Sequence, residues 1–253
     1  PCDPYDYDGI NEVILADIGG KKVWLHGDRN GYLYSIDRTN AQCNWVVPLG
    51  TVDWNAGFGD NCTPIMDWPK MDVTYDKVTR VWPTLDGGKE WHPMAYSERS
   101  GLVYVPTYNF YMDLQAGLME WHAGEWYLGS SILRFGSGNG AVNAYDAATG
   151  DMIWTRPSAA PATGGIMATA GGLVFFGGAD GHFQAANDET GEALWSFQTG
   201  SGVHGNPTSY TVEGEQYVTI VSGAGGGGLW PLTYGDWLQT HTKGGMIIAF
   251  GLH

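Results

Sequence analysis

Two carboxylates near the start of the chain are the residues best suited to acid–base or metal chemistry. Asp6 and Asp8 stand two positions apart and alternate with Tyr5 and Tyr7. In a strand this spacing places both carboxylates on one face, and in a turn it can converge them on a cation. The aromatic neighbours could shield the carboxylates from water and so adjust their basicity. An acidic, solvated turn is the alternative interpretation.

A second candidate is an arginine in a glycine-flanked turn. Arg29 lies at the centre of residues 27–31, between two segments with strand character. At a strand corner, a planar guanidinium can donate parallel hydrogen bonds to a carbonyl or carboxylate. An ordinary salt bridge, for instance to Asp28, is the alternative.

Other familiar catalytic patterns are weak. The glycine run at 223–228 formally matches Gly-x-Gly-x-x-Gly, but residues 229–231 do not start the helix that a dinucleotide site needs. We expect this run to allow close approach to a flat ligand or to form a loop. The histidines lack zinc-ligand spacing, and Ser201 and Ser222 lack a nucleophile-elbow context.

A repeat predicts the elements that position these residues. Residues 144–154 return as residues 186–195, and both copies end on tryptophan, Trp154 and Trp195. A fainter copy at 34–40 is followed by Trp45. Hairpins repeating at about forty residues are typical of β-propeller blades, with the matched aromatics packed between neighbouring blades. Two unrelated hairpins in a β-sandwich are the alternative.

Composition agrees with an all-β chain. The 253 residues include 39 glycines, 12 tryptophans and 14 tyrosines, which favour short strands and tight turns. At about forty residues a blade, the chain supplies about four blades, which is either a small ring or part of a larger one. The net charge of -15 argues against nucleic-acid binding and leaves room for a basic protein partner. No segment reaches the roughly 18 apolar residues of a membrane span.

The cysteines and the chain start add two expectations. Cys43 and Cys62 could pair, which would leave Cys2 over. No Cys-x-x-Cys-His is present, so we expect no c-type haem on this chain. Because the chain opens at Pro1 without a methionine or a signal peptide, we expect a processed or truncated product.

Taken together, these residues resemble the pyrroloquinoline quinone-dependent alcohol dehydrogenases, most closely the methanol dehydrogenase branch. That family is an eight-bladed propeller with the quinone at the centre of one end. The resemblance implies that residues 1–253 are its C-terminal part, about four blades. The family's vicinal disulfide and two metal ligands, a Glu and an Asn, would then belong to the other part. The motifs that carry the likeness keep the family's order: residues 6–12, 28–38, 87–91, 164–171 and the tryptophan repeats.

The resemblance assigns roles by position. Asp6 matches the catalytic aspartate that also touches the metal. Asp8 matches the extra aspartate of the lanthanide-dependent branch, where calcium enzymes usually carry a small residue. Arg29 matches the arginine that hydrogen-bonds the reactive quinone oxygens. The further residues that would contact the cofactor are Glu90, Trp91, Gly227 and Trp230.

The implied reaction is oxidation of a primary alcohol, of the methanol or ethanol type, to the aldehyde. A lanthanide or calcium ion would act as a Lewis acid on the quinone, and Asp6 would take the alcohol proton while hydride passes to the quinone. Arg29 would stabilise the developing oxygen charge. The family passes its electrons to a soluble cytochrome c in the periplasm, and a homodimer is compatible with it.

Departures from the family pattern leave substrate specificity open. Thr163 stands where a cofactor-flanking tryptophan is common, and Trp82 and Tyr111 occupy positions that form a disulfide in the methanol enzymes. One alternative is a non-catalytic propeller scaffold of the bacterial envelope, which would not need the Asp-x-Asp beside a glycine-flanked arginine. The other is a quinone-dependent polyol or sugar dehydrogenase, which would share Arg29 but lack the metal role of Asp8.

Overall fold

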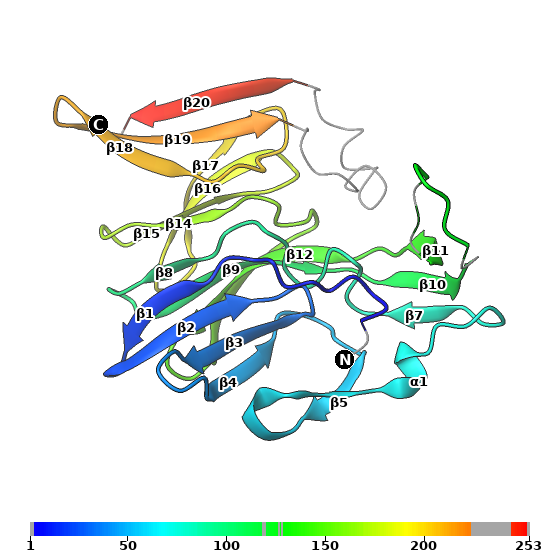
Figure 1. The fold of residues 1–253 in the computed structure, drawn as a ribbon. Helices are drawn as coiled ribbons and strands as arrows, with labels where there is room; N and C mark the ends of the chain where they lie inside the picture. The colour runs from blue at the N-terminus through cyan, green and yellow to red at the C-terminus, as the bar shows by residue number, and fades with distance from the viewer. Residues whose placement is uncertain (1–2, 118–119, 126, 128, 224–243, 252–253) are drawn as a thin grey trace.

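The chain folds into antiparallel β-sheets that are stacked face to face (Figure 1). The structure, a computed structural model, describes residues 3–117, 120–125, 127, 129–223 and 244–251. Three of the stacked sheets have four strands and the last has three. The predicted all-β propeller class is confirmed, whereas the number of blades in a complete ring stays a prediction.

Each sheet is built from consecutive hairpins, with one insertion in the second. Neighbouring strands pair in antiparallel register throughout. The first sheet contains β1 (Ile14–Ile18), β2 (Lys21–Gly27), β3 (Tyr32–Asp37) and β4 (Cys43–Pro48). The second contains β8 (Ala95–Ser97), β9 (Leu102–Asn109), β12 (Asn139–Asp146) and β13 (Met152–Ser158).

The third and fourth sheets continue the same pattern. The third contains β14 (Ile166–Ala168), β15 (Leu173–Gly177), β16 (His182–Asn187) and β17 (Ala193–Gln198). The fourth contains β18 (Thr208–Val212), β19 (Glu215–Gly223) and β20 (Gly245–Gly251). Figure 1 shows the four sheets following one another in chain order, from β1 in blue to β20 in red.

Apolar side chains fill the space between successive sheets, because each strand alternates its residues between the two faces. Leu25 and Leu33 of the first sheet pack with Val103 and Val105 of the second. The second and third sheets share another cluster, and so do the third and fourth. The buried members of the cluster between the second and third sheets include Tyr104, Ala144, Val174 and Phe176. Those of the cluster between the third and fourth sheets include Phe175, Phe183, Val218 and Ile220.

The repeated tryptophans join one sheet to the next. A Cβ added to Gly150 would lie 2.9 Å from the Trp45 ring, and one added to Gly191 would lie 2.7 Å from the Trp154 ring. Both glycines have positive φ, +82 and +71 respectively, in the turn before the outermost strand. The expectation that the aromatics pack between neighbouring blades is confirmed. Each ring covers the glycine turn of the following sheet.

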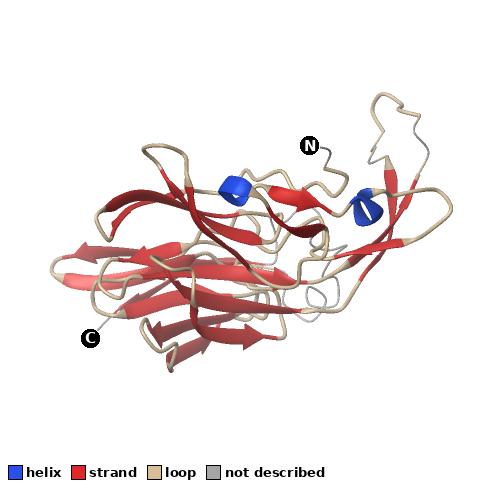
Figure 2. Cartoon of the chain, turned by 90° about the horizontal axis from the view of Figure 1, so that it is seen from below, coloured by secondary structure: helices blue, strands red, loops and turns tan. Residues whose placement is uncertain are grey.

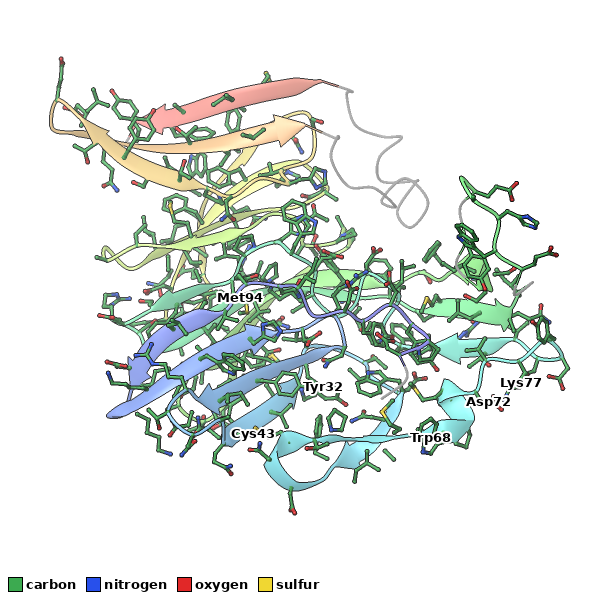
Figure 3. All side chains as sticks on the ribbon, viewed as in Figure 1. Tyr32, Cys43, Trp68, Asp72, Lys77 and Met94 are labelled. Atoms are coloured by element: carbon green, nitrogen blue, oxygen red, sulfur yellow. A yellow bond between two sulfur atoms is a disulfide. The ribbon has the colours of Figure 1, made fainter. Side chains whose placement is uncertain are left out.

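An inserted layer covers the opposite face of the first sheet. It joins β7, β10 and β11 into one small sheet, and β5 and β6 into another. Its elements are β5 (Asn55–Phe58), η1 (Asp60–Cys62), β6 (Pro64–Met66), α1 (Trp68–Met71), β7 (Thr79–Val81), β10 (Met112–Ala116) and β11 (Ser130–Phe135). Seen from below, both helical turns and the N-terminal segment lie along one side of the strands (Figure 2). Trp68, Asp72 and Lys77 lie together at its outer end (Figure 3).

A disulfide ties this layer to the first sheet. Cys43, at the start of β4, is bonded to Cys62 in η1, with the two Cα atoms 5.9 Å apart. The structure thus contains the pairing that the sequence allowed but left open, and Cys2 lies outside the described residues. None of the helices in the described part of the chain has the length and apolar character of a membrane span.

Candidate active site

Arg29 forms the centre of the candidate site. It lies in the turn from β2 to β3, which is closed by hydrogen bonds between the main chains of Asp28 and Tyr32 and of Gly31 and Asp28. Arg29 is buried, with 8% of its surface exposed. Asp28, the alternative partner considered from the sequence, pairs instead with His26, at 3.5 Å.

Three of the predicted site carboxylates surround this guanidinium. Nη1 of Arg29 lies 2.7 Å from Oδ1 of Asp8, and Nη2 lies 3.7 Å from Oδ2 of Asp6. Nε lies 3.3 Å from Oε1 of Glu90. Nη2 also donates a hydrogen bond to the Leu85 carbonyl. The structure therefore brings together Asp6, Asp8, Arg29 and Glu90 from three separate segments of the chain.

Two tyrosines anchor the segment that carries Asp6 and Asp8. Tyr5 and Tyr7 are buried in the inserted layer and donate hydrogen bonds to the carbonyls of Lys70 and Pro83. The two carboxylates face outward, with 62% and 60% of their side-chain surfaces exposed, whereas the tyrosine rings point into the layer. The expectation that the tyrosines shield the carboxylates is therefore wrong.

The backbone at Asp6 is unusual, and its side chain is perturbed. Its φ of +68 lies in the left-handed region, which non-glycine residues adopt at a cost of about 1 kcal/mol or more. Partial burial raises the pKa of the Asp6 carboxyl, the Arg29 charge opposes that rise, and the Asp8 charge adds to it. A carboxylate whose pKa is raised is a better proton acceptor once it is ionised.

Glu90 and Trp91 occupy different environments. The Glu90 side chain is 12% exposed, and its second oxygen, Oε2, accepts a hydrogen bond of 2.7 Å from the Trp91 main chain. The Trp91 ring is 47% exposed and stacks on His92 with 4.0 Å between centroids. Both oxygens of Glu90 are therefore engaged within the chain, whereas much of the Trp91 ring remains open for a planar ligand.

Sequence reasoning missed residues directly behind this site. Lys89 is buried and forms an ion pair with Glu12 at 2.9 Å. Asn11 donates hydrogen bonds of 3.0 and 3.4 Å to the carbonyls of Gly27 and Lys89. The motif at 87–91 contains Lys89, but Glu12 is 77 residues away along the chain. No local pattern could have indicated that they pair.

The residues present fit an anionic, planar ligand beside a hard cation. Asp6 and Asp8 offer two outward-facing anionic oxygen donors, and hard cations prefer such ligands. Nε of Arg29 is buried and, although it lies 3.3 Å from Glu90, makes no well-aligned hydrogen bond among the described residues. Within those residues, no group of three His, Cys, Asp or Glu side chains could hold a metal ion alone. The predicted contacts Gly227 and Trp230 lie outside the described residues.

The structure shows the surroundings of the residues that depart from the family pattern, Trp82, Tyr111 and Thr163. The rings of Trp82 and Tyr111 pack with 5.2 Å between centroids, and Arg80 lies 3.9 Å from the centroid of the Tyr111 ring. An aromatic contact thus stands where the resemblance implies a disulfide in the methanol enzymes. Thr163 is completely buried, and its hydroxyl has no partner among the described residues.

Comparison with known proteins agrees with this geometry. Residues 155–218 match the family model of the glucose/ethanol/alcohol dehydrogenase β-propeller domain that carries the label PQQ. Over its whole length the chain is 36% identical to quinoprotein alcohol dehydrogenase PedH of Pseudomonas putida, of which it covers 45%. It is also 36% identical to a lanthanide-dependent methanol dehydrogenase of Methylacidiphilum fumariolicum, with 89% of this chain and 39% of that protein covered. The chain is therefore similar to the quinoprotein alcohol dehydrogenases.

A solved structure supports the same relationship. A europium-containing methanol dehydrogenase superposes with a TM-score of 0.88 at 31% identity, covering 99% of this chain and 49% of that one. The predicted resemblance to this quinoprotein family is confirmed. The chain spans about half the length of the curated relatives that it matches.

Proposed function

We propose that this chain forms part of a pyrroloquinoline quinone-dependent dehydrogenase that oxidises a primary alcohol, of the methanol or ethanol type, to the aldehyde. The observation that carries the proposal is the convergence of Asp6, Asp8 and Glu90 on the buried Arg29. This cluster lies on a propeller whose relatives are quinoprotein alcohol dehydrogenases. When bound, the quinone supplies a two-electron acceptor and the metal ion a Lewis acid.

Arg29 and Trp91 are the residues that would hold the quinone. Arg29 presents a positive charge that its neighbours fix in place, so charge that develops on a ligand oxygen meets a preorganised donor. The exposed part of the Trp91 ring offers a flat apolar surface. Glu90 acts through the arginine, because its oxygens are occupied by Arg29 and by the main chain of Trp91.

Asp6 is the residue that would accept the alcohol proton. Its carboxylate is largely exposed and lies 3.7 Å from Arg29, beyond an ordinary hydrogen bond, so it keeps lone pairs for a substrate hydroxyl. Burial raises the pKa of Asp6, which favours proton transfer to it.

Asp8 favours a highly charged cation. Three carboxylates share one arginine, so the cluster carries excess negative charge that a bound cation would neutralise. A trivalent lanthanide gains more from an additional anionic oxygen than calcium does, and we propose a lanthanide as the preferred metal, with calcium as the alternative.

We propose an extracytoplasmic, periplasmic setting with a soluble cytochrome c as electron acceptor. The disulfide between Cys43 and Cys62 supports an oxidising compartment, because structural disulfides are rare in reducing ones. The net charge of -15 supports electrostatic attraction of a basic acceptor.

The test is quinone binding and alcohol oxidation by the intact protein that carries this chain. Purified protein loaded with quinone and metal should show the quinone absorption and reduce a dye in an alcohol-dependent manner. Asp6→Ala should lower that dye reduction by about 100-fold or more, as loss of a general base does. Asp17→Ala, which removes an exposed carboxylate on β1, is the matched control. Absence of bound quinone, or full activity of Asp6→Ala, would refute the proposal.

A further inference from the structure

An ion pair between a buried lysine and a partly exposed glutamate lies directly behind the arginine cluster. The Lys89 side chain is completely buried, and its Nζ lies 2.9 Å from Oε2 of Glu12. The same Nζ donates a 2.9 Å hydrogen bond to the carbonyl of Glu90. The other oxygen of Glu12 accepts a 2.7 Å hydrogen bond from the Met94 main chain. Lys89 therefore fixes the main chain that carries Glu90 and links it to the N-terminal segment.

The lysine stem also contacts the turn that carries Arg29. A Cβ added to Gly27 would lie 2.6 Å from Cδ of Lys89, so the stem lies against the first residue of the turn. The main chain of Gly88 donates a 3.1 Å hydrogen bond to the Arg29 carbonyl. A side chain on Gly87 would collide with the Arg29 main chain, so these two segments cross in direct contact. Lys89 thus touches, or lies beside, every segment that supplies the site.

Resting on the proposed function, we infer that Lys89, paired with Glu12, is a positioning residue for quinone binding. Its charge and stem hold together the segment of Asp6 and Asp8, the turn of Arg29 and the segment of Glu90. Among the described residues, the Lys89 ammonium pairs with Glu12 and the Glu90 carbonyl and not with Arg29, Asp6 or Asp8, so it acts through their placement.

Burial of the Lys89 charge is better explained by placement than by stability. Removing an ammonium group from water costs several kcal/mol, and an ion pair inside a protein is often no more stabilising than apolar residues of the same size. A displacement of about 1 Å in a positioning element can lower a reaction rate about 100-fold. The guanidinium of Arg29 is at the end of a long side chain with three carboxylates around it, so its direction depends on a fixed main chain.

The first measurement is the dissociation constant of pyrroloquinoline quinone, by absorbance or fluorescence titration of the intact protein. Lys89→Met keeps the stem and removes the charge, and Glu12→Gln removes the partner. Each should raise the dissociation constant at least tenfold. Arg38→Met, which removes an exposed ion pair with Asp17 in the same sheet, should leave it unchanged.

The second measurement separates placement from stability. The double variant Lys89→Met/Glu12→Gln leaves neither charge buried alone, so its urea midpoint should be closer to wild type than that of Glu12→Gln. Its affinity for the quinone should remain at least tenfold weaker than that of wild type. Recovery of affinity together with stability would overturn the positioning role.

The third measurement needs no quinone and therefore separates this inference from the proposed function. Hydrogen exchange in the unloaded protein should be at least tenfold faster at residues 27–31 in Lys89→Met than in wild type, and unchanged in Arg38→Met. If wild type binds no quinone, the proposed function fails while this exchange result still decides whether Lys89 holds the turn. Unchanged exchange and unchanged affinity would overturn the inference.

Discussion

Arg29 is closer to Asp8 than to Asp6. Its Nη1 lies 2.7 Å from Oδ1 of Asp8, whereas its Nη2 lies 3.7 Å from Oδ2 of Asp6. The two aspartates therefore differ in their availability, although both are largely exposed and are separated by one residue. Asp8 pairs directly with the guanidinium through Oδ1, so the Asp6 carboxylate is the less engaged of the two.

Replacing Asp8 should change the metal that the protein selects. In Asp8→Ala the site loses one anionic oxygen, so its preference for a trivalent ion over calcium should fall by about tenfold or more. The check is elemental analysis after incubation with equal concentrations of a lanthanide and calcium. Asp17→Ala should retain the wild-type ratio, and an unchanged ratio in Asp8→Ala would exclude Asp8 as a metal ligand.

Arg29 cannot be replaced by lysine without loss. The N–H groups of its planar guanidinium point in different directions, toward Asp8, Glu90 and the Leu85 carbonyl. The single ammonium group of lysine cannot reproduce this arrangement of donors. In Arg29→Lys, alcohol-dependent dye reduction should fall by about 100-fold. The matched exposed change, Arg38→Lys, should have no effect. Near-normal activity of Arg29→Lys would show that only the charge matters.

The contact between Trp154 and Gly191 should be measurable as stability. Gly191→Ala places a methyl group 2.7 Å from the ring at a φ of +71, so both crowding and backbone strain act. We expect a loss of about 2–4 kcal/mol in the free energy of unfolding. Gly19→Ala, at a φ of +58 with nothing within 4 Å, isolates the strain and should lose only about 1 kcal/mol. Equal losses in the two variants, measured by urea unfolding, would contradict tryptophan docking as the cause.

The inserted layer should weaken in acid. Hydrogen bonds of 2.8 and 2.9 Å from Arg80 lower the pKa of Asp113 below its ordinary value. A carboxyl with a lowered pKa in the folded state contributes stability above its unfolded pKa, and this contribution disappears as the pH falls through the folded pKa. Asp113→Asn should therefore have a lower urea midpoint than wild type at pH 7 and the same midpoint near pH 2. A difference that persists in acid would assign the effect to packing.

The repeats could be predicted because their signals are local. A strand, a turn with glycine and a strand ending on tryptophan lie within about a dozen residues, and each signal acts through its own backbone preferences. The positions of Trp45 and Trp154 in the sequence therefore predicted correctly that their rings pack between neighbouring sheets, although not which sheet each ring contacts. The pairing of Cys43 with Cys62 was also within reach, because few pairings exist for three cysteines.

The interior of the site could not be predicted in the same way. The pairing of Lys89 with Glu12 joins residues 77 positions apart, and neither has a local partner that would indicate it. The inserted layer likewise pairs β7 with β10 across a long connection. The expectation for Tyr5 and Tyr7 fails for a simpler reason, because residues that are adjacent in sequence need not have adjacent side chains.

The docking of each tryptophan on the following glycine turn has a direction. The second sheet carries both halves of this junction: Trp154 covers a glycine turn of the third sheet, and its own Gly150 lies under Trp45 of the first. A duplicated stretch of about forty residues would therefore bring both halves of the junction with it. Such a copy could be inserted between two existing sheets without any change in their sequences. Gene duplication is therefore a simple route to rings with different numbers of blades.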